Sequence, residues 1–237
     1  MELYDSLASW WPLVSPVEDY EAAAAAQWRV MTASSQRRIG SLLELGCGGG
    51  NNAYYLRQRC DVVLTDLSAA MLDISRAINP DCDHRQGDMR TLRTGRMYDA
   101  VFIHDAVMYM RNEADLFAVM ETARAHLSPG GVVLLCPDAT RESWLPAAEH
   151  CVRRGGGRTL YYLDCASDPD PTDSETILDV VLVMREVDDR VRVAHDRHHH
   201  GLFPESTWMA LLDRAGFAAS RGHDADVSAV RFVGVAR

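Results

Sequence analysis

From Ser41 onward, short apolar runs alternate with segments of helical pattern, and this alternation constrains the fold more than any other feature of the sequence. The runs that predict strands are 41–45, 61–65, 99–104 and 131–136. The segments that predict helices are 52–59, 68–77 and 113–127, the last closed by Ser128-Pro129-Gly130-Gly131. Strands that alternate with helices form a parallel sheet covered on both faces. We therefore predict an α/β fold.

The pattern changes after Cys136. Residues 158–165, 176–187 and 190–200 are typical of extended strands, and no helical pattern separates them. Antiparallel pairing is the simplest arrangement of such strands. The chain then returns to the first pattern, with a predicted helix over 204–215 and a final strand over about 229–236.

The amino-terminal segment is predicted to be helical over residues 15–33. Ser15 can cap this helix, Pro16 suits its first turn and Glu18 completes a capping box. Tyr4, Trp10 and Trp11 precede it and form an aromatic cluster. This cluster either covers the core or closes over a ligand, and core packing is the favoured interpretation.

A chain of 237 residues can bury one substantial core, so we expect a single domain. Its predicted parts are a helical lid at 1–40, a cofactor-binding core at 41–154, an antiparallel insertion at 155–203, and a helix and strand at 204–237 that complete the core. The insertion follows the fifth strand, so it can cover the ends of the strands and determine substrate specificity. It is also a candidate surface for a homodimer.

Composition excludes several classes of function. A formal charge of −10 disfavours nucleic acid as a partner, because phosphate backbones are bound by cations. All 24 basic residues are arginine, which excludes lysine Schiff bases and P-loop phosphate transfer. The six cysteines are scattered and predicted to be reduced. With neither a signal sequence nor an apolar run of membrane-spanning length, a cytoplasmic enzyme is expected.

The strongest chemical motif is the stretch from Glu44 to Gly50, Glu-Leu-Gly-Cys-Gly-Gly-Gly, which ends one predicted strand and precedes a helix. Glycines in such a turn let the backbone approach a ligand closely. Gly48, Gly50 and Ala53 also fit the dinucleotide pattern G-x-G-x-x-A, so this turn alone does not separate two ligands. Asp66, which ends the second strand, can accept hydrogen bonds from the ribose that both ligands contain.

Later elements separate the two ligands. Gly87-Asp88-Met89 follows a short third strand, His104-Asp105 ends the fourth, and Leu127 to Gly131 forms a turn before the fifth. With the glycine turn and Asp66, this ordered set resembles the class I S-adenosylmethionine-dependent methyltransferases over most of the chain from Ser41. The resemblance implies a Rossmann-like sheet with S-adenosylmethionine as the cofactor.

The resemblance also implies roles for individual residues. The turn from Glu44 to Gly50 would wrap the methionine part, with Glu44 near its amino group. Asp66 would hold the ribose, Leu67 would line the adenine pocket, and Asp88 would receive the adenine amino group beside Met89. The implied cofactor-binding residues are Tyr4, Glu44, Gly46, Gly48, Gly50, Asp66, Leu67, Met71, Asp88, Met89 and His104. The candidate catalytic residues are His104, Asp105 and Tyr109, with His104 facing the methyl group as a possible general base.

A narrower resemblance connects the chain to sugar and small-amine N-methyltransferases. It depends on Tyr4, the pair Asp19-Tyr20, the extended strands and the run Gly201-Leu202-Phe203. The expected function is therefore methyl transfer to a small molecule, with an amine of an amino sugar or natural-product intermediate as acceptor. The alternatives are O-methylation, a NAD-dependent oxidoreductase and a non-catalytic regulator that binds the cofactor.

Several of these residues also have structural interpretations. Asp66 could cap the helix near Ser68, Asp88 could stabilise a turn, and His104 could be a hydrogen-bonded core histidine. The run His198-His199-His200 invites a metal site, but strand alternation places only His198 and His200 on one face, beside Asp196. We therefore expect no metal there, and a structural or substrate-facing role instead.

Overall fold

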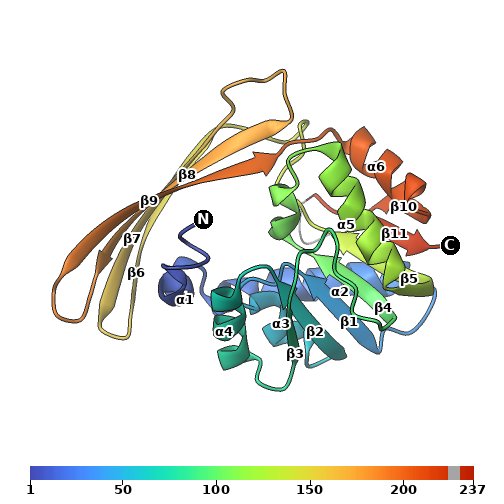
Figure 1. Cartoon of the computed structure of the whole chain (residues 1–237), viewed down its shortest axis with the longest axis horizontal. Coiled ribbons are helices and arrows are strands. Elements are labelled where there is room, and N and C mark those ends of the chain that lie inside the picture. Colours follow the sequence, from blue (N-terminus) through green and yellow to red (C-terminus); the bar gives the residue numbers. More distant parts are fainter. Residues whose placement is uncertain (224–229) are drawn as a thin grey trace.

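A seven-stranded sheet lies at the centre of the computed structural model, which describes residues 1–223 and 230–237 (Figure 1). Its strand order is β10-β11-β5-β4-β1-β2-β3. The strands are β1 (Ser41–Leu45), β2 (Asp61–Asp66), β3 (Asp83–Gln86), β4 (Tyr98–Ile103), β5 (Leu127–Leu135), β10 (Phe217–Arg221) and β11 (Phe232–Ala236). β1 to β5 pair in parallel, whereas β11 is antiparallel to both β5 and β10.

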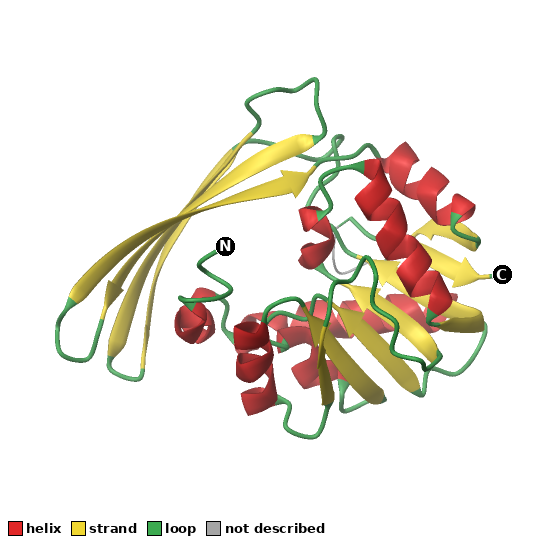
Figure 2. Ribbon diagram, in the orientation of Figure 1, coloured by secondary structure: helices red, strands yellow, loops and turns green. Residues whose placement is uncertain are grey.

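Alternation along these strands divides the core into two layers. Leu43 and Val101 pack on one face with two helices, and Leu42 and Phe102 pack on the other face with three. The first pair of helices is α5 (Glu113–Ala125) and α6 (Glu205–Arg214); the second group is α2 (Glu21–Ser34), α3 (Asn51–Leu56) and α4 (Ala69–Ile78). Figure 2 shows helices on both sides of the sheet. This arrangement confirms the predicted fold class.

A second sheet, of four antiparallel strands, extends away from the central one (Figure 1). Its strands are β6 (Ala147–Gly155), β7 (Arg158–Ser167), β8 (Glu175–Arg185) and β9 (Val191–Gly201). The amino-terminal segment, with η1 (Ala8–Trp10) and α1 (Trp11–Val14), lies between the two sheets. Leu7 and Trp10 of that segment pack against Leu160 and Leu182 of the antiparallel sheet. Trp10 is therefore a core residue, as its favoured interpretation predicted.

The structure adds strands that the sequence does not predict. The expected antiparallel strands match β7, β8 and β9, but β6 is a fourth, and it begins at Ala147, before the predicted boundary at 155. β6 is an edge strand with almost no buried side chain, so it lacks the alternation that identifies a half-buried strand. β10 is a further strand that was not predicted. β11 confirms the last predicted strand from Phe232, while Ala229 lies outside the described residues.

The predicted cap of the amino-terminal helix is wrong. Residues Val17–Tyr20 form a 3₁₀ turn, η2, and α2 begins only at Glu21, with no side-chain hydrogen bond at its N-cap. The Ser15 hydroxyl is instead hydrogen-bonded to the hydroxyl of Tyr20 at 2.7 Å. Ser15 therefore contacts the next turn through a tyrosine and does not form the capping box with Glu18.

The predicted turn after α5 belongs to strand β5 itself. α5 ends at Ala125, and Ser128 to Gly131 form an irregularity in the pairing of β5 with β4, where Gly130 has a φ of +77°. The N-cap of α4 is Ser68, whose hydroxyl accepts the Met71 N–H. Among the residues that the structure describes, no helix is both long enough and apolar enough to cross a bilayer.

Candidate functional site

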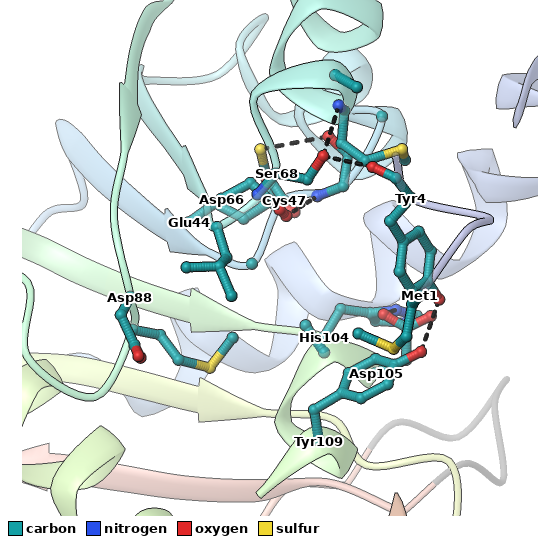
Figure 3. Close-up of a pocket in the computed structure, with 18 of the residues that line it drawn as sticks. Met1, Tyr4, Glu44, Cys47, Asp66, Ser68, Asp88, His104, Asp105 and Tyr109 are labelled. Atoms are coloured by element: carbon teal, nitrogen blue, oxygen red, sulfur yellow. Dashed lines mark hydrogen bonds and ion pairs between the residues drawn. The ribbon is translucent and has the colours of Figure 1, made fainter. Parts of the chain in front are cut away.

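A cleft of about 780 Å³ opens at the carboxyl ends of β1, β2 and β4, on the side that faces the amino-terminal segment. The carboxyl ends of parallel strands are where open α/β sheets bind ligands. The predicted site residues that line the cleft are Tyr4, Glu44, Gly46, Gly48, Asp66, Leu67, Met71, Asp88, Met89, His104, Asp105 and Tyr109. The fold therefore brings together in one space residues that are scattered over a hundred positions of the chain (Figure 3).

The glycine turn has positive φ angles that favour glycine, and at Gly46 it also leaves no room for a side chain. Gly46 has a φ of +71°, and a Cβ there would lie 2.5 Å from the Ala106 Cβ and 2.7 Å from the Met89 Cε. Gly48 has a φ of +53° and faces the cleft. Gly50 does not line the cleft: it is the N-cap of α3, and its carbonyl accepts a hydrogen bond from the Asn79 side chain. Gly50 thus supports the conformation of the turn on the side away from the cleft.

Glu44 is a buried carboxylate that lines the cleft. It is 1% exposed, and its Oε2 has no hydrogen-bond partner among the described residues. Burial raises the pKa of Glu44 to about 8, and the charge of His104 only partly opposes this rise. An unpaired buried carboxylate is costly, so this position is suited to a cationic ligand group.

Asp66 connects the glycine turn to the start of α4. Its Oδ2 accepts the Gly48 N–H at 2.8 Å, and its Oδ1 accepts the Ser68 N–H, also at 2.8 Å. Burial raises the pKa of Asp66 despite these bonds. Each carboxylate oxygen keeps a free lone pair, so ribose hydroxyls can still be accepted. Both interpretations of Asp66, helix contact and ligand contact, are therefore compatible with this geometry.

Asp88 and Met89 line another part of the cleft. Figure 3 shows Asp88 at a distance from Tyr4 and Tyr109. The carboxylate of Asp88 is held by Arg90, with its Oδ2 2.6 Å from a guanidinium nitrogen. The hydrogen bond from Arg90 lowers the pKa of Asp88. Asp88 therefore stays ionised and keeps acceptor capacity for an amino group.

The opposite end of the cleft is rich in titratable groups from η3 (Asp105–Tyr109) and the residue before it. His104 Nδ1 lies 3.3 Å from Asp105 Oδ1. Burial opposes protonation of His104, but the charge and hydrogen bond of Asp105, together with the charges of Asp138 and Glu44, outweigh it and raise the histidine's pKa. Burial likewise opposes ionisation of Asp105, whose pKa is nevertheless held low by His104. The two side chains therefore favour the ion pair.

The sequence analysis did not single out Asp138, which contributes a further charge near this pair. Its pKa is raised to about 6, by burial and by the charge of Asp105. A recognisable signal existed, because Asp138 lies three residues after the end of β5, at the same edge of the sheet where His104 follows β4. Tyr20 also lines the cleft, with its ring centroid 6.2 Å from that of His104 and its pKa raised by burial to about 12.

Tyr4 and Tyr109 meet at the same end of the cleft. Their hydroxyls are 2.8 Å apart (Figure 3). The Tyr109 hydroxyl is also 2.6 Å from His198 Nδ1. The backbone of Tyr4 is fixed as well, because the Ser68 hydroxyl donates to its carbonyl. Tyr4 therefore connects the amino-terminal segment to the helix that begins beside Asp66.

The three consecutive histidines are arranged as strand alternation predicts. His198 and His200 face the same side of β9, with ring centroids 6.2 Å apart, and both contact the Tyr109 ring. His199 faces the other side, 3.7 Å from Glu175. Within residues 1–223 and 230–237, no group of three His, Cys, Asp or Glu side chains has a geometry that could hold a metal ion.

Comparison with known proteins assigns this cleft to a methyltransferase. Residues 42–131 match the family model described as a methyltransferase domain. The dTDP-3-amino-3,4,6-trideoxy-alpha-D-glucopyranose N,N-dimethyltransferase of Streptomyces venezuelae is 30% identical over 205 residues, which are 84% of each chain. The matched domain includes the glycine turn and Asp66, and thus favours the methyltransferase interpretation of that turn over the dinucleotide one.

Solved structures agree with this assignment. The crystal structure of Streptomyces venezuelae DesVI is 27% identical, covers 92% of each chain and superposes with a TM-score of 0.83. CalS10, an amino pentose methyltransferase from Micromonospora echinaspora solved with S-adenosylmethionine bound, shares the fold at 24% identity, 92% coverage of each chain and a TM-score of 0.78.

Proposed function

The chain belongs to the S-adenosylmethionine-dependent methyltransferases, in the family that contains the amino-sugar N,N-dimethyltransferases, and we propose that its acceptor is the amino group of a nucleotide-linked amino sugar. The observation that carries this proposal is the acidic end of the cleft, where Asp105 lies beside His104 with the charge of Asp138 nearby. A carboxylate there attracts an ammonium group and gives no such advantage to a neutral hydroxyl.

The cofactor fits the other side of the cleft. Glu44 Oε2 is an orphaned buried oxygen, which a ligand ammonium group would satisfy, and Gly46 and Gly48 leave the backbone bare beside it. Asp66 would hold the ribose, with Leu67, Met71 and Met89 on the walls. S-adenosylmethionine supplies a methyl group on a positively charged sulfur. The roles of these residues are part of the proposal.

The protein contributes mainly by positioning. Alignment of an acceptor lone pair with a methyl carbon can supply about 7–11 kcal/mol of the barrier reduction. We propose that Tyr4, Tyr109 and Asp105 hold the acceptor amine, and that the amino-terminal segment covers this end of the cleft and excludes water from it. The Asp105 carboxylate would orient the amine, and His104 would keep that carboxylate ionised.

His104 remains the candidate general base that the sequence suggested, and its pKa bears on this role. Because the pKa of His104 is raised, a larger share of it is protonated at neutral pH than of an exposed histidine. A protonated imidazole cannot accept a proton. The structure therefore supports a role for His104 in the ion pair more strongly than a role as base.

The proposal includes a homodimer that forms through the outer face of the antiparallel sheet. Val152, Tyr161, Val183 and Val193 are consecutive cross-strand neighbours, so they form an apolar row over all four strands. Tyr161 is 42% exposed and Val193 is 68% exposed. A second copy would bury this row. Light scattering should give twice the chain mass for the wild type and the chain mass for Val193→Arg; a monomeric wild type would contradict the dimer.

A cytoplasmic location and the exclusion of nucleic acid complete the proposal. The free cysteines of the structure suit a reducing compartment, and the negative net charge disfavours phosphate backbones. Fractionation of the source cells tests the location, and a filter-binding assay with DNA and RNA tests the second point.

The acceptor proposal is tested by offering matched sugars. A nucleotide-linked amino sugar should be methylated with the donor present, and the same sugar with a hydroxyl in place of the amine should not. Asp105→Asn should raise the KM for the amine more than it raises the donor KM, because the carboxylate contacts the acceptor. Turnover of the hydroxyl sugar with none of the amine would contradict the proposal.

A further inference from the structure

A row of polar side chains, made up of Tyr4, Tyr109, His198 and Asp196, extends from the acceptor end of the cleft into the antiparallel sheet. Tyr4 lines the cleft and its hydroxyl accepts a hydrogen bond from that of Tyr109 at 2.8 Å, while the Tyr109 oxygen also lies 2.6 Å from His198 Nδ1. The other ring nitrogen of His198, Nε2, lies 3.2 Å from Asp196 Oδ2. This row of side chains therefore joins the amino-terminal segment, η3 and β9, which are far apart in the sequence.

His198 is buried within this row of side chains. It is 1% exposed, while the side chain of Asp196 is 11% exposed. Asp196 Oδ2 also accepts the Leu3 N–H at 2.8 Å, which fixes the carboxylate against the amino-terminal segment. His198 Nδ1 is thus within hydrogen-bond distance of a tyrosine hydroxyl, while Nε2 faces the Asp196 carboxylate at 3.2 Å without a hydrogen bond among the described residues.

Among the described residues, the charged and titratable groups that face His198 come from β9, η3 and the amino-terminal segment. Asp196 and His200 are on its own strand, Tyr109 is on η3, and Tyr4 and the amino group of Met1 belong to the amino-terminal segment. Burial and the Met1 amino group lower the pKa of His198, and Asp196 only partly offsets them. His198 is thus neutral at neutral pH, in contrast to His104, whose pKa is raised.

We infer that His198 takes up, through the Tyr109 hydroxyl, the proton that the acceptor amine must lose, and that Asp196 positions and stabilises His198 for this step. The inference depends on the proposed amine acceptor. Tyr109 touches the acceptor; His198 and Asp196 act through it and are positioning residues.

The proton transfer balances without any further reactant. The Tyr109 hydroxyl hydrogen, which is directed at Tyr4 in the structure, first turns toward His198, whose neutral ring carries its hydrogen on Nε2 and leaves Nδ1 free to accept. An N–H bond of the acceptor ammonium then breaks and its proton passes to the Tyr109 oxygen, while the Tyr109 O–H proton passes to His198 Nδ1. The amine keeps the electron pair that attacks the methyl carbon. The products are a neutral amine, an intact Tyr109 phenol and an imidazolium paired with the Asp196 carboxylate, which later releases its proton to solvent. Hydroxyl groups can serve in this way because each both donates and accepts a hydrogen bond.

Steady-state kinetics of His198→Asn over a range of pH tests the inference. Asparagine can keep a hydrogen bond to Tyr109 but cannot take up a proton. We expect kcat at neutral pH to fall by about 100-fold or more. The defect should shrink as pH rises, because solvent then deprotonates the amine. Tyr109→Phe should show the same loss, and the double variant should lose no more than either single variant, because the two residues act in one path.

The matched control is His195→Asn, on the same strand but facing the other side, where His195 contacts Asp179. It should keep the wild-type kcat and pH profile. Melting temperature and donor affinity, measured for all variants, separate a folding defect from a kinetic one. The inference is overturned if His198→Asn keeps the wild-type profile, or if the losses of the two single variants multiply in the double variant.

Failure of the proposed acceptor would look different. If the wild type methylated only a hydroxyl, the amine proposal would be wrong. The relay would then predict a loss in His198→Asn that does not shrink with rising pH, because an alcohol stays protonated throughout. If the kcat of His198→Asn on that hydroxyl substrate equalled the wild-type kcat at every pH, the relay would be overturned as well.

Discussion

Replacement of Glu44 by glutamine tests how the cleft recognises its cofactor. With a pKa of about 8, roughly nine-tenths of Glu44 is protonated at pH 7 in the free enzyme. A ligand ammonium group at Oε2 would displace that proton, so binding should release nearly one proton. Affinity should then rise about tenfold per pH unit up to about pH 8. Glu44→Gln should remove this dependence and weaken binding above pH 8 by about 1.5–3 kcal/mol, roughly 10- to 100-fold.

Isothermal titration calorimetry with S-adenosylhomocysteine, which keeps the ammonium group, measures both quantities. Two buffers of different ionisation enthalpy count the protons released. Glu121→Gln, on an exposed position of α5, is the matched control and should behave as the wild type. Binding of the wild type without proton release, with an affinity that does not vary with pH, would refute the placement of the ammonium group at Glu44.

The same substitution has a stability signature in the ligand-free protein. The pKa of Glu44 is raised from 4.5 to about 8 by burial, so the unfolded chain gives up this proton at lower pH than the folded one does. The contribution of Glu44 to stability is therefore present below about pH 4.5 and lost as pH rises through about 8. The melting temperature of Glu44→Gln should exceed that of the wild type by a margin that grows over this interval.

Three other substitutions test the remaining site residues. Asp66→Ala removes the acceptor of the Gly48 and Ser68 N–H groups, and calorimetry should show cofactor affinity at least tenfold weaker; an unchanged Kd would contradict the ribose assignment. Gly46→Ala should abolish cofactor binding and lower the melting temperature, because its Cβ would meet Ala106, whereas Gly95→Ala, with a similar φ of +72° and open space, should lose only about 1–2 kcal/mol; equal losses would count against this packing. His104→Asn should lower kcat moderately through Asp105, and kinetics in which the variant matches the wild type at every pH would remove His104 from the mechanism.

The inner strands β1, β2, β4 and β5 were predictable because they are largely buried and contain few polar residues. Leu42 and Leu43 pack in opposite layers, so the run around them is apolar throughout. β6 lacks that signal, since an edge strand over solvent needs no apolar alternation. The Ser15 capping box failed because Tyr20 offered the Ser15 hydroxyl a competing partner. A local motif cannot show which tertiary contact will form.

The same contrast holds for the site. The glycine turn and Asp66 were recognisable because both follow the carboxyl ends of the neighbouring strands β1 and β2, which brings them together at the cleft. Alternation along β9 correctly placed His198 and His200 on one face. The contact between His198 and Tyr109 could not be foreseen, because it depends on how the antiparallel sheet packs against η3, across 89 positions of the chain. The neutral state of His198 follows from that packing alone.

The central claim is that one cleft holds S-adenosylmethionine between the glycine turn and Asp66 while an amine approaches from Asp105 and Tyr109. Mass spectrometry of a nucleotide-linked amino sugar, incubated with the enzyme and a methyl-labelled donor, tests this claim directly. The account predicts a product with one or two labelled methyl groups on its nitrogen, and none with Asp66→Ala. Label on an oxygen, or unmodified sugar beside an enzyme that binds the donor, would contradict it.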